Sequence, residues 1–149
     1  MNLIRPWLYV GKYRDTLDYG LLAAHNIGAM LQLAEAVKQP GIASLYVPIE
    51  DGVPMPDSLL RRGVEFVLSE KRLGQVVLIA CGAGMSRSVA YAVAVLKEEE
   101  DLSLLEALRV IKSHHPDSMP HPALWESLCH YYREEFSLHS MLDVVILAG

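Results

Sequence analysis

The chain has 149 residues and a mass of 16.6 kDa, enough for one domain with a sizeable core. Hydrophobic residues make up 52% and charged residues 21%, which excludes a disordered or collagen-like chain. The formal net charge is −5, and no basic cluster is longer than Arg61-Arg62, so we expect no nucleic-acid partner.

The first half of the chain is predicted to alternate between strands and helices. Short apolar runs predict strands at residues 7–10, 29–33 and 45–49. Thr16 is expected to cap a helix between the first two strands. After the third strand, residues 50–57 contain two prolines and a glycine, so they are expected to form a loop. Asp57 is expected to cap the next helix, which ends near Gly74.

A strand, a short loop and a helix are predicted in the middle of the chain. Residues 75–80 contain the run Val-Val-Leu-Ile-Ala, which is typical of a strand covered on both faces, as in a parallel sheet. A loop over residues 81–87 then leads into a helix over residues 88–100.

The C-terminal part is predicted to be helical. Ser103 and Glu106 form a capping box that opens one helix, and a last helix is predicted over residues 123–136. The order of elements predicts an α/β fold with a mostly parallel central sheet flanked by helices. We expect one domain over residues 1–136 and a tail over residues 137–149. This tail could pack back on the domain, pair with another chain or remain loose.

The cysteine content and the apolar runs indicate where the protein works. Cys81 and Cys129 are too few for a disulfide framework and form no C-x-x-C pair. No apolar run approaches the roughly 20 residues of a membrane span, and residues 1–6 lack the core of a signal peptide. We therefore expect a cytoplasmic protein with no membrane association. The oligomeric state does not follow from the sequence.

The seven residues from Cys81 to Arg87 lie at the sheet edge where ligands bind in open α/β folds. Gly82 and Gly84 allow the backbone to curl, so that its N–H groups and the following helix N-terminus form an anion cradle. The guanidinium of Arg87 can grip two oxygens of a tetrahedral oxyanion. Cys81 is expected at the floor of the cradle, where N–H dipoles favour a thiolate. A thiolate beneath a bound phosphate is a nucleophile aimed at phosphorus.

The alternative for this loop is purely structural. A cysteine at the end of an apolar strand is usually a small buried hydrophobe, and a C-x5-R match alone is a weak signal. The strand before the loop, its two glycines, the Ser88 hydroxyl and the helix after it favour the catalytic interpretation.

The loop Cys81-Gly82-Ala83-Gly84-Met85-Ser86-Arg87-Ser88 resembles the signature loop of the dual-specificity phosphatases, within the cysteine-based protein tyrosine phosphatases. The resemblance covers about residues 5–135. The other segments that carry it are Trp7–Gly11, Asn26–Leu33, Tyr46–Asp51 and Ser118–His121 with Trp125 and Leu128.

The resemblance implies a phosphatase that acts on phosphotyrosine and on phosphoserine or phosphothreonine in proteins. The implied chemistry runs through a phosphocysteine intermediate on Cys81, with no metal and no organic cofactor. It also implies that the Ser88 hydroxyl stabilises the thiolate when this intermediate is hydrolysed. The residues implied to bind the phosphate are Gly82, Ala83, Gly84, Met85, Ser86 and Arg87.

Asp51 is the candidate general acid. Displacing an alkoxide or phenoxide requires a proton for the leaving oxygen, which is typically worth ~10²–10⁴ in rate. Asp51 lies on the proline- and glycine-containing loop, thirty positions before Cys81, a separation similar to that of the family's acid. Glu50 is the alternative, although its side chain should point the other way if the strand is still extended there.

Several residues depart from the family's pattern or lie outside it. Ala80 stands where the family usually has a histidine that helps order the loop, and His121 stands where it usually has asparagine. His114 and His115 are expected to interact with a helix dipole and not to bind a metal. Cys129 is expected in the core.

Two other functions stay open at this point. One is a phosphatase acting on phosphoinositides or other non-protein phosphates, which is disfavoured because residues 82–86 include no basic side chain. The other is a weakly active phosphate-binding module, which Ala80 suggests. Retention of Cys81, Arg87, Ser88 and Asp51 argues against it.

Overall fold

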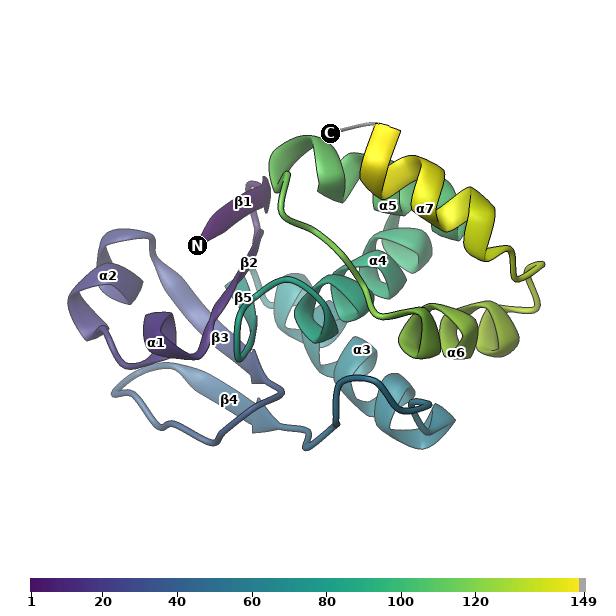
Figure 1. The fold of residues 1–149 in the computed structure, drawn as a ribbon. Coiled ribbons are helices and arrows are strands. Elements are labelled where there is room, and N and C mark those ends of the chain that lie inside the picture. Colours follow the sequence, from purple (N-terminus) through teal and green to yellow (C-terminus); the bar gives the residue numbers. More distant parts are fainter. Residues whose placement is uncertain (148–149) are drawn as a thin grey trace.

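A five-stranded sheet forms the centre of the protein in a computed structural model that describes residues 1–147 (Figure 1). Its strands are β1 (Asn2–Arg5), β2 (Leu8–Lys12), β3 (Ile27–Gln32), β4 (Ala43–Tyr46) and β5 (Val76–Cys81), in the order β1-β2-β5-β3-β4. β1 and β2 pair antiparallel, and all other neighbours pair parallel. The expected α/β fold with a mostly parallel sheet is confirmed.

Helices cover both faces of this sheet (Figure 1). They are α1 (Tyr13–Thr16), α2 (Tyr19–Ala24), α3 (Asp57–Arg72), α4 (Arg87–Glu100), α5 (Leu104–His114), α6 (Pro122–Tyr132) and α7 (Leu138–Leu147). The short helices α1 and α2 lie on one side of the sheet and the five longer helices on the other. Among residues 1–147, none of the helices has the length and hydropathy of a bilayer-spanning segment.

β5 is the central strand, and it is buried on both faces, as its continuous apolar run predicts. Leu78 and Ala80 pack on the α2 side with Leu22 and Met30. Val77, Ile79 and Cys81 face the large core on the α4 side. The alternation along the strand therefore directs Cys81 toward the helix that follows it.

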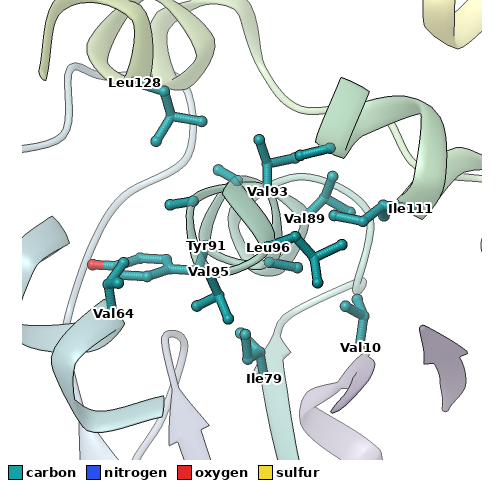
Figure 2. Close-up of a cluster of buried hydrophobic side chains, with 14 of the residues drawn as sticks. Val10, Val64, Ile79, Val89, Tyr91, Val93, Val95, Leu96, Ile111 and Leu128 are labelled. Carbon is teal, nitrogen blue, oxygen red and sulfur yellow. The ribbon is translucent and has the colours of Figure 1, made fainter. Parts of the chain in front are cut away.

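α4 is enclosed by its neighbours along most of its length, with residues 88–96 all buried. Figure 2 shows Val93 and Ile111 on one side of this helix, Val64 beside Tyr91 on another, and Ile79 and Val10 below it. The Tyr91 hydroxyl donates a hydrogen bond to the carbonyl of Leu59 at 2.8 Å. This packing fixes the helix whose N-terminus meets the Cys81 loop.

The predicted cap at Thr16 is wrong. Thr16 is the last residue of α1, and its hydroxyl donates to the Tyr13 carbonyl at 2.6 Å. Asp18 caps α2 instead, because its carboxylate accepts the Leu21 N–H at 3.0 Å. A threonine bonded back into its own turn is not free to start the next one.

The predicted cap at Asp57 is also displaced by one residue. Pro56 is the N-cap of α3, with an extended backbone, and Asp57 is the first helical residue. The carboxylate still lies at the positive end of the helix dipole, where it is stabilising. The capping box is confirmed, since Ser103 accepts the Glu106 N–H and the Glu106 carboxylate accepts the Ser103 N–H.

The C-terminal helices differ from expectation in extent. α6 ends at Tyr132, four residues before the predicted end, because Arg133 adopts a left-handed conformation with φ +55°. The tail then forms α7, which packs back on α5 and buries Met141, Val144 and Val145 in the core. Residues 148–149 of the tail lie outside the described residues.

Candidate active site

The loop between β5 and α4 is held in place by hydrogen bonds that neighbouring segments donate to its backbone carbonyl groups. The Tyr13 N–H donates to the Gly82 carbonyl at 3.4 Å, and the Met119 N–H donates to the Met85 carbonyl at 2.8 Å. Nε2 of His115 donates to the Gly84 carbonyl at 2.7 Å. In a trans peptide the carbonyl and the next N–H point in opposite directions. The N–H groups of residues 83, 85 and 86 are therefore turned away from these partners.

Gly84 is required by the tight turn in this loop. Its φ is +73°, a conformation that L side chains rarely adopt. A Cβ at this position would also lie 2.9 Å from the Gly11 carbonyl oxygen of β2. The loop is thus pressed against the neighbouring strand at Gly84, where there is no side chain in the way.

Cys81 lies at the base of the loop, as expected, with 2% of its surface exposed. Its Sγ lies 3.1 Å from Oγ of Ser88, in hydrogen-bond contact. Ser88 is fully buried in the first turn of α4. The hydroxyl is the polar group that contacts the sulfur from the helix side.

Arg87 opens α4 and turns its side chain toward the loop. A Cβ on Gly82 would lie 3.1 Å from Arg87 Nη2, so the guanidinium lies beside the loop backbone. Nη1 donates to the Ile49 carbonyl at 3.2 Å. This bond connects the signature loop to the segment that carries Asp51.

Asp51 is linked to the same loop. Its Oδ1 accepts a hydrogen bond from the Ser86 hydroxyl at 2.6 Å. The Ser86 oxygen in turn accepts the backbone N–H of His121 at 2.9 Å. Residues from three separate segments therefore meet at the Ser86 hydroxyl.

These side chains line one cleft of about 250 Å³. The lining residues are Asp51, Cys81, Ala83, Met85, Ser86, Arg87 and Met119. The alternative acid Glu50 is exposed and lies outside this set in the described part of the chain.

A larger cavity of about 410 Å³ lies elsewhere, between the start of α5, α6 and the segment before α7. It contains Cys129, which is buried as expected, together with Glu134 and Glu135. Burial, and then the charges of Glu134 and Glu126, raise the pKa of Cys129 to about 11. In the described part of the chain, its lining includes two carboxylates and no cationic side chain, so it is poorly suited to a phosphate.

For His115, the sequence predicted only an interaction with a helix dipole. The structure buries it and directs its Nε2 onto the signature loop, across 31 positions of sequence. A histidine just after a helix carries no local signal for such a contact, because the contact depends on how α5 packs. His115 is thus part of the support of the loop.

The structure also places the two residues that depart from the family's pattern, His121 and Ala80. His121 caps α6, since its Nδ1 accepts the Ala123 N–H at 3.0 Å. Its ring also faces the acid loop, with Nε2 3.5 Å from the position of a Cβ on Gly52. Ala80 is buried in the apolar cluster on the α2 side, on the sheet face opposite to Cys81.

Comparison with known proteins identifies the family. Residues 8–134 match the model of the dual specificity phosphatase catalytic domain. The chain belongs to the dual-specificity phosphatase family. Human dual specificity phosphatase 28 is 35% identical over 145 residues, which cover 94% of this chain and 81% of that protein. Mouse dual specificity protein phosphatase 19 is 27% identical over 135 residues, which cover 88% of this chain.

The fold agrees with this family. The crystal structure of human DUSP28 matches with a TM-score of 0.83 and 26% identity, covering 89% of this chain and 96% of that one. The domain is therefore that of a protein-tyrosine/dual-specificity phosphatase, within the hydrolases. The chain spans 61% of the length of the mouse relative.

Proposed function

We propose that the protein hydrolyses phosphotyrosine and phosphoserine or phosphothreonine in protein substrates through a phosphocysteine intermediate. One observation carries the proposal: the Cys81 thiol and the Arg87 guanidinium of the signature loop line one cleft with the Asp51 carboxylate, which lies thirty positions before Cys81. Membership of the dual-specificity phosphatase family supports phosphorylated proteins as the substrate class.

The backbone N–H groups of the loop and the Arg87 side chain bind the phosphate group of the substrate. The N–H groups of residues 83, 85 and 86 point away from the partners of the loop carbonyls, a direction suited to an anion in the cradle. Arg87 uses Nη1 on the Ile49 carbonyl, which leaves its other N–H donors for two phosphate oxygens. No metal takes part in this step.

The first chemical step transfers the phosphoryl group to sulfur. The Cys81 thiolate attacks phosphorus, an S–P bond forms, and the bond between phosphorus and the side-chain oxygen breaks. Asp51 gives its proton to the leaving oxygen. Since Ser86 occupies Oδ1, Oδ2 of Asp51 is left to carry that proton.

The second step releases inorganic phosphate. Asp51, now a carboxylate, takes a proton from water while the water oxygen attacks the phosphocysteine. The S–P bond breaks and the thiolate leaves. The Ser88 hydroxyl, 3.1 Å from Sγ, can then donate its proton in a hydrogen bond that stabilises the returning thiolate.

The proposed setting is a reducing, cytoplasmic compartment. Cys81 and Cys129 are both free thiols in the structure, and the mechanism requires Cys81 to remain one. Oxidation of this sulfur would block the attack on phosphorus.

Parallel turnover assays test the proposed function. The substrates are phosphotyrosine and phosphothreonine peptides and a phosphoinositide, and Cys81→Ser purified in the same way controls for contaminating phosphatases. We expect turnover of both peptides by the wild type, little on the lipid, and none by Cys81→Ser. Turnover of the phosphoinositide alone would overturn the assignment to protein substrates.

A further inference from the structure

Two methionines form one side of the candidate active-site cleft. Met85 belongs to the signature loop and Met119 to the connector between α5 and α6, and both line the cleft. The bond from the Met119 N–H to the Met85 carbonyl, at 2.8 Å, fixes the two segments against each other. The backbones that carry the two side chains are therefore hydrogen-bonded to each other, which fixes their relative position.

Their exposure sets them apart from the other four methionines, of which Met1 is partly buried. Met30, Met55 and Met141 are buried in the core, whereas Met85 is 41% exposed and Met119 is 42% exposed. Cys81, by contrast, is only 2% exposed at the floor of the same cleft. A substrate group that reaches the sulfur therefore enters a cleft lined in part by these two methionines.

The charged residues that line the cleft are all used in the proposed chemistry, so they cannot distinguish one phosphorylated side chain from another. Asp51, Cys81 and Arg87 are the ionisable residues that line it in the described chain, and all three have roles in the proposed chemistry. Among the residues that the structure describes, no further lysine or arginine lines the cleft to bind a second phosphate or an acidic flank. The net charge of −5 gives no long-range attraction for a phosphorylated segment.

We propose that Met85 and Met119 form an apolar wall that packs against the aromatic ring of phosphotyrosine, which makes aryl phosphomonoesters the favoured substrates. This inference rests on the proposed function. The ring of phosphotyrosine spans the distance between a buried phosphate and the exposed rim, and methionine sulfur makes favourable contacts with aromatic rings. Phosphothreonine has no ring to contact the wall, so it gains only the phosphate interactions.

The test compares kcat/KM on two peptides that differ only in phosphotyrosine or phosphothreonine. We expect Met85→Ala and Met119→Ala each to lower the value on phosphotyrosine by roughly 3- to 10-fold, mainly through KM, a loss in the range of sulfur–aromatic contacts. For Met119→Ala, the value on phosphothreonine should change by less than about 2-fold, since that substrate does not use the wall. For Met85→Ala, whose backbone N–H belongs to the phosphate cradle, the measured quantity is the ratio of the two values. The ratio of the two values does not depend on the fraction of folded enzyme.

Two controls sharpen the comparison. Met119→Leu keeps an apolar side chain of similar size and should retain most of the phosphotyrosine preference. Leu73→Ala removes an exposed apolar residue at the C-terminal end of α3, away from the cleft, and should leave the ratio unchanged. An unchanged ratio in both methionine variants, with both peptides still turned over, would overturn this inference alone. No turnover of either peptide by the wild type would overturn the proposed function and this inference with it.

Discussion

Oγ of Ser86 lies 2.6 Å from Oδ1 of Asp51 and donates a hydrogen bond to it. The same oxygen accepts the backbone N–H of His121, so its position is fixed from the α6 side. Ser86 therefore holds the loop that carries the candidate acid over the loop that carries the candidate nucleophile.

Ser86→Ala removes this contact, and we expect it to act on the proton-transfer step. The kcat/KM on alkyl phosphates, which are poor leaving groups, reports the first step and should fall by roughly 10-fold, less than the ~10²–10⁴ that a general acid contributes in full. The kcat/KM on p-nitrophenyl phosphate, whose leaving group needs little protonation, should change far less. Ser86→Thr keeps the hydroxyl and is the matched control. An equal loss of kcat/KM on both substrates would contradict a role in positioning Asp51 for proton transfer to the leaving group.

Asp51→Asn tests the acid itself. An amide cannot supply the proton, so kcat on poor leaving groups should fall by ~10²–10⁴. Glu50→Gln is the control, since Glu50 lies outside the cleft lining in the described residues. If Glu50→Gln produced this pattern and Asp51→Asn did not, Glu50 would be the acid.

The two cysteines should differ sharply in reactivity. Burial and nearby carboxylates raise the pKa of Cys129 to about 11, so near neutral pH its sulfur is almost wholly the unreactive thiol. We expect iodoacetamide to label Cys81 at pH 7, inorganic phosphate to protect it, and Cys129 to remain unlabelled until the pH approaches 11. Peptide mapping by mass spectrometry separates the two sites. Preferential labelling of Cys129 at neutral pH would contradict this assignment.

His115 is expected to act through the signature loop. His115→Leu would leave the buried Gly84 carbonyl without its donor, a loss that typically costs about 1–3 kcal/mol. The affinity for vanadate, which depends on the loop N–H groups, should fall more than 5-fold. His115→Gln retains a donor and should recover most of that affinity. If both variants lost stability equally but bound vanadate as the wild type does, His115 would have only a packing role.

Local sequence patterns predicted the parts of the site that depend on neighbouring residues. The apolar run of β5 predicted burial on both faces, and the glycines after it predicted a tight loop, which Gly84 forms with its φ of +73°. Contacts over long sequence distances left no such signal. The strand β1, with Asn2 and Arg5 among its four residues, has no apolar run, and its pairing with β2 defines it.

The same limit explains why the supporting residues were missed. The bond from His115 to Gly84 and the bond from Ser86 to Asp51 join residues more than thirty positions apart. Each depends on where a helix or loop is placed by the packed core. The sequence left the structure of the tail open for the same reason. Met141 is buried because α7 packs on α5, and this contact depends on how the chain folds.

A covalent phosphoryl group on Cys81 is the species on which the proposed mechanism depends. Ser88→Ala removes the hydroxyl that contacts Sγ, so the thiolate should leave more slowly and the intermediate should accumulate. The measurement is mass spectrometry of this variant after acid quenching during turnover of a phosphotyrosine peptide. The expected result is one added phosphoryl group on the peptide that contains Cys81, absent from the Cys81→Ser enzyme. Continued turnover by Cys81→Ser, or a phosphoryl group on a different residue, would contradict the mechanism.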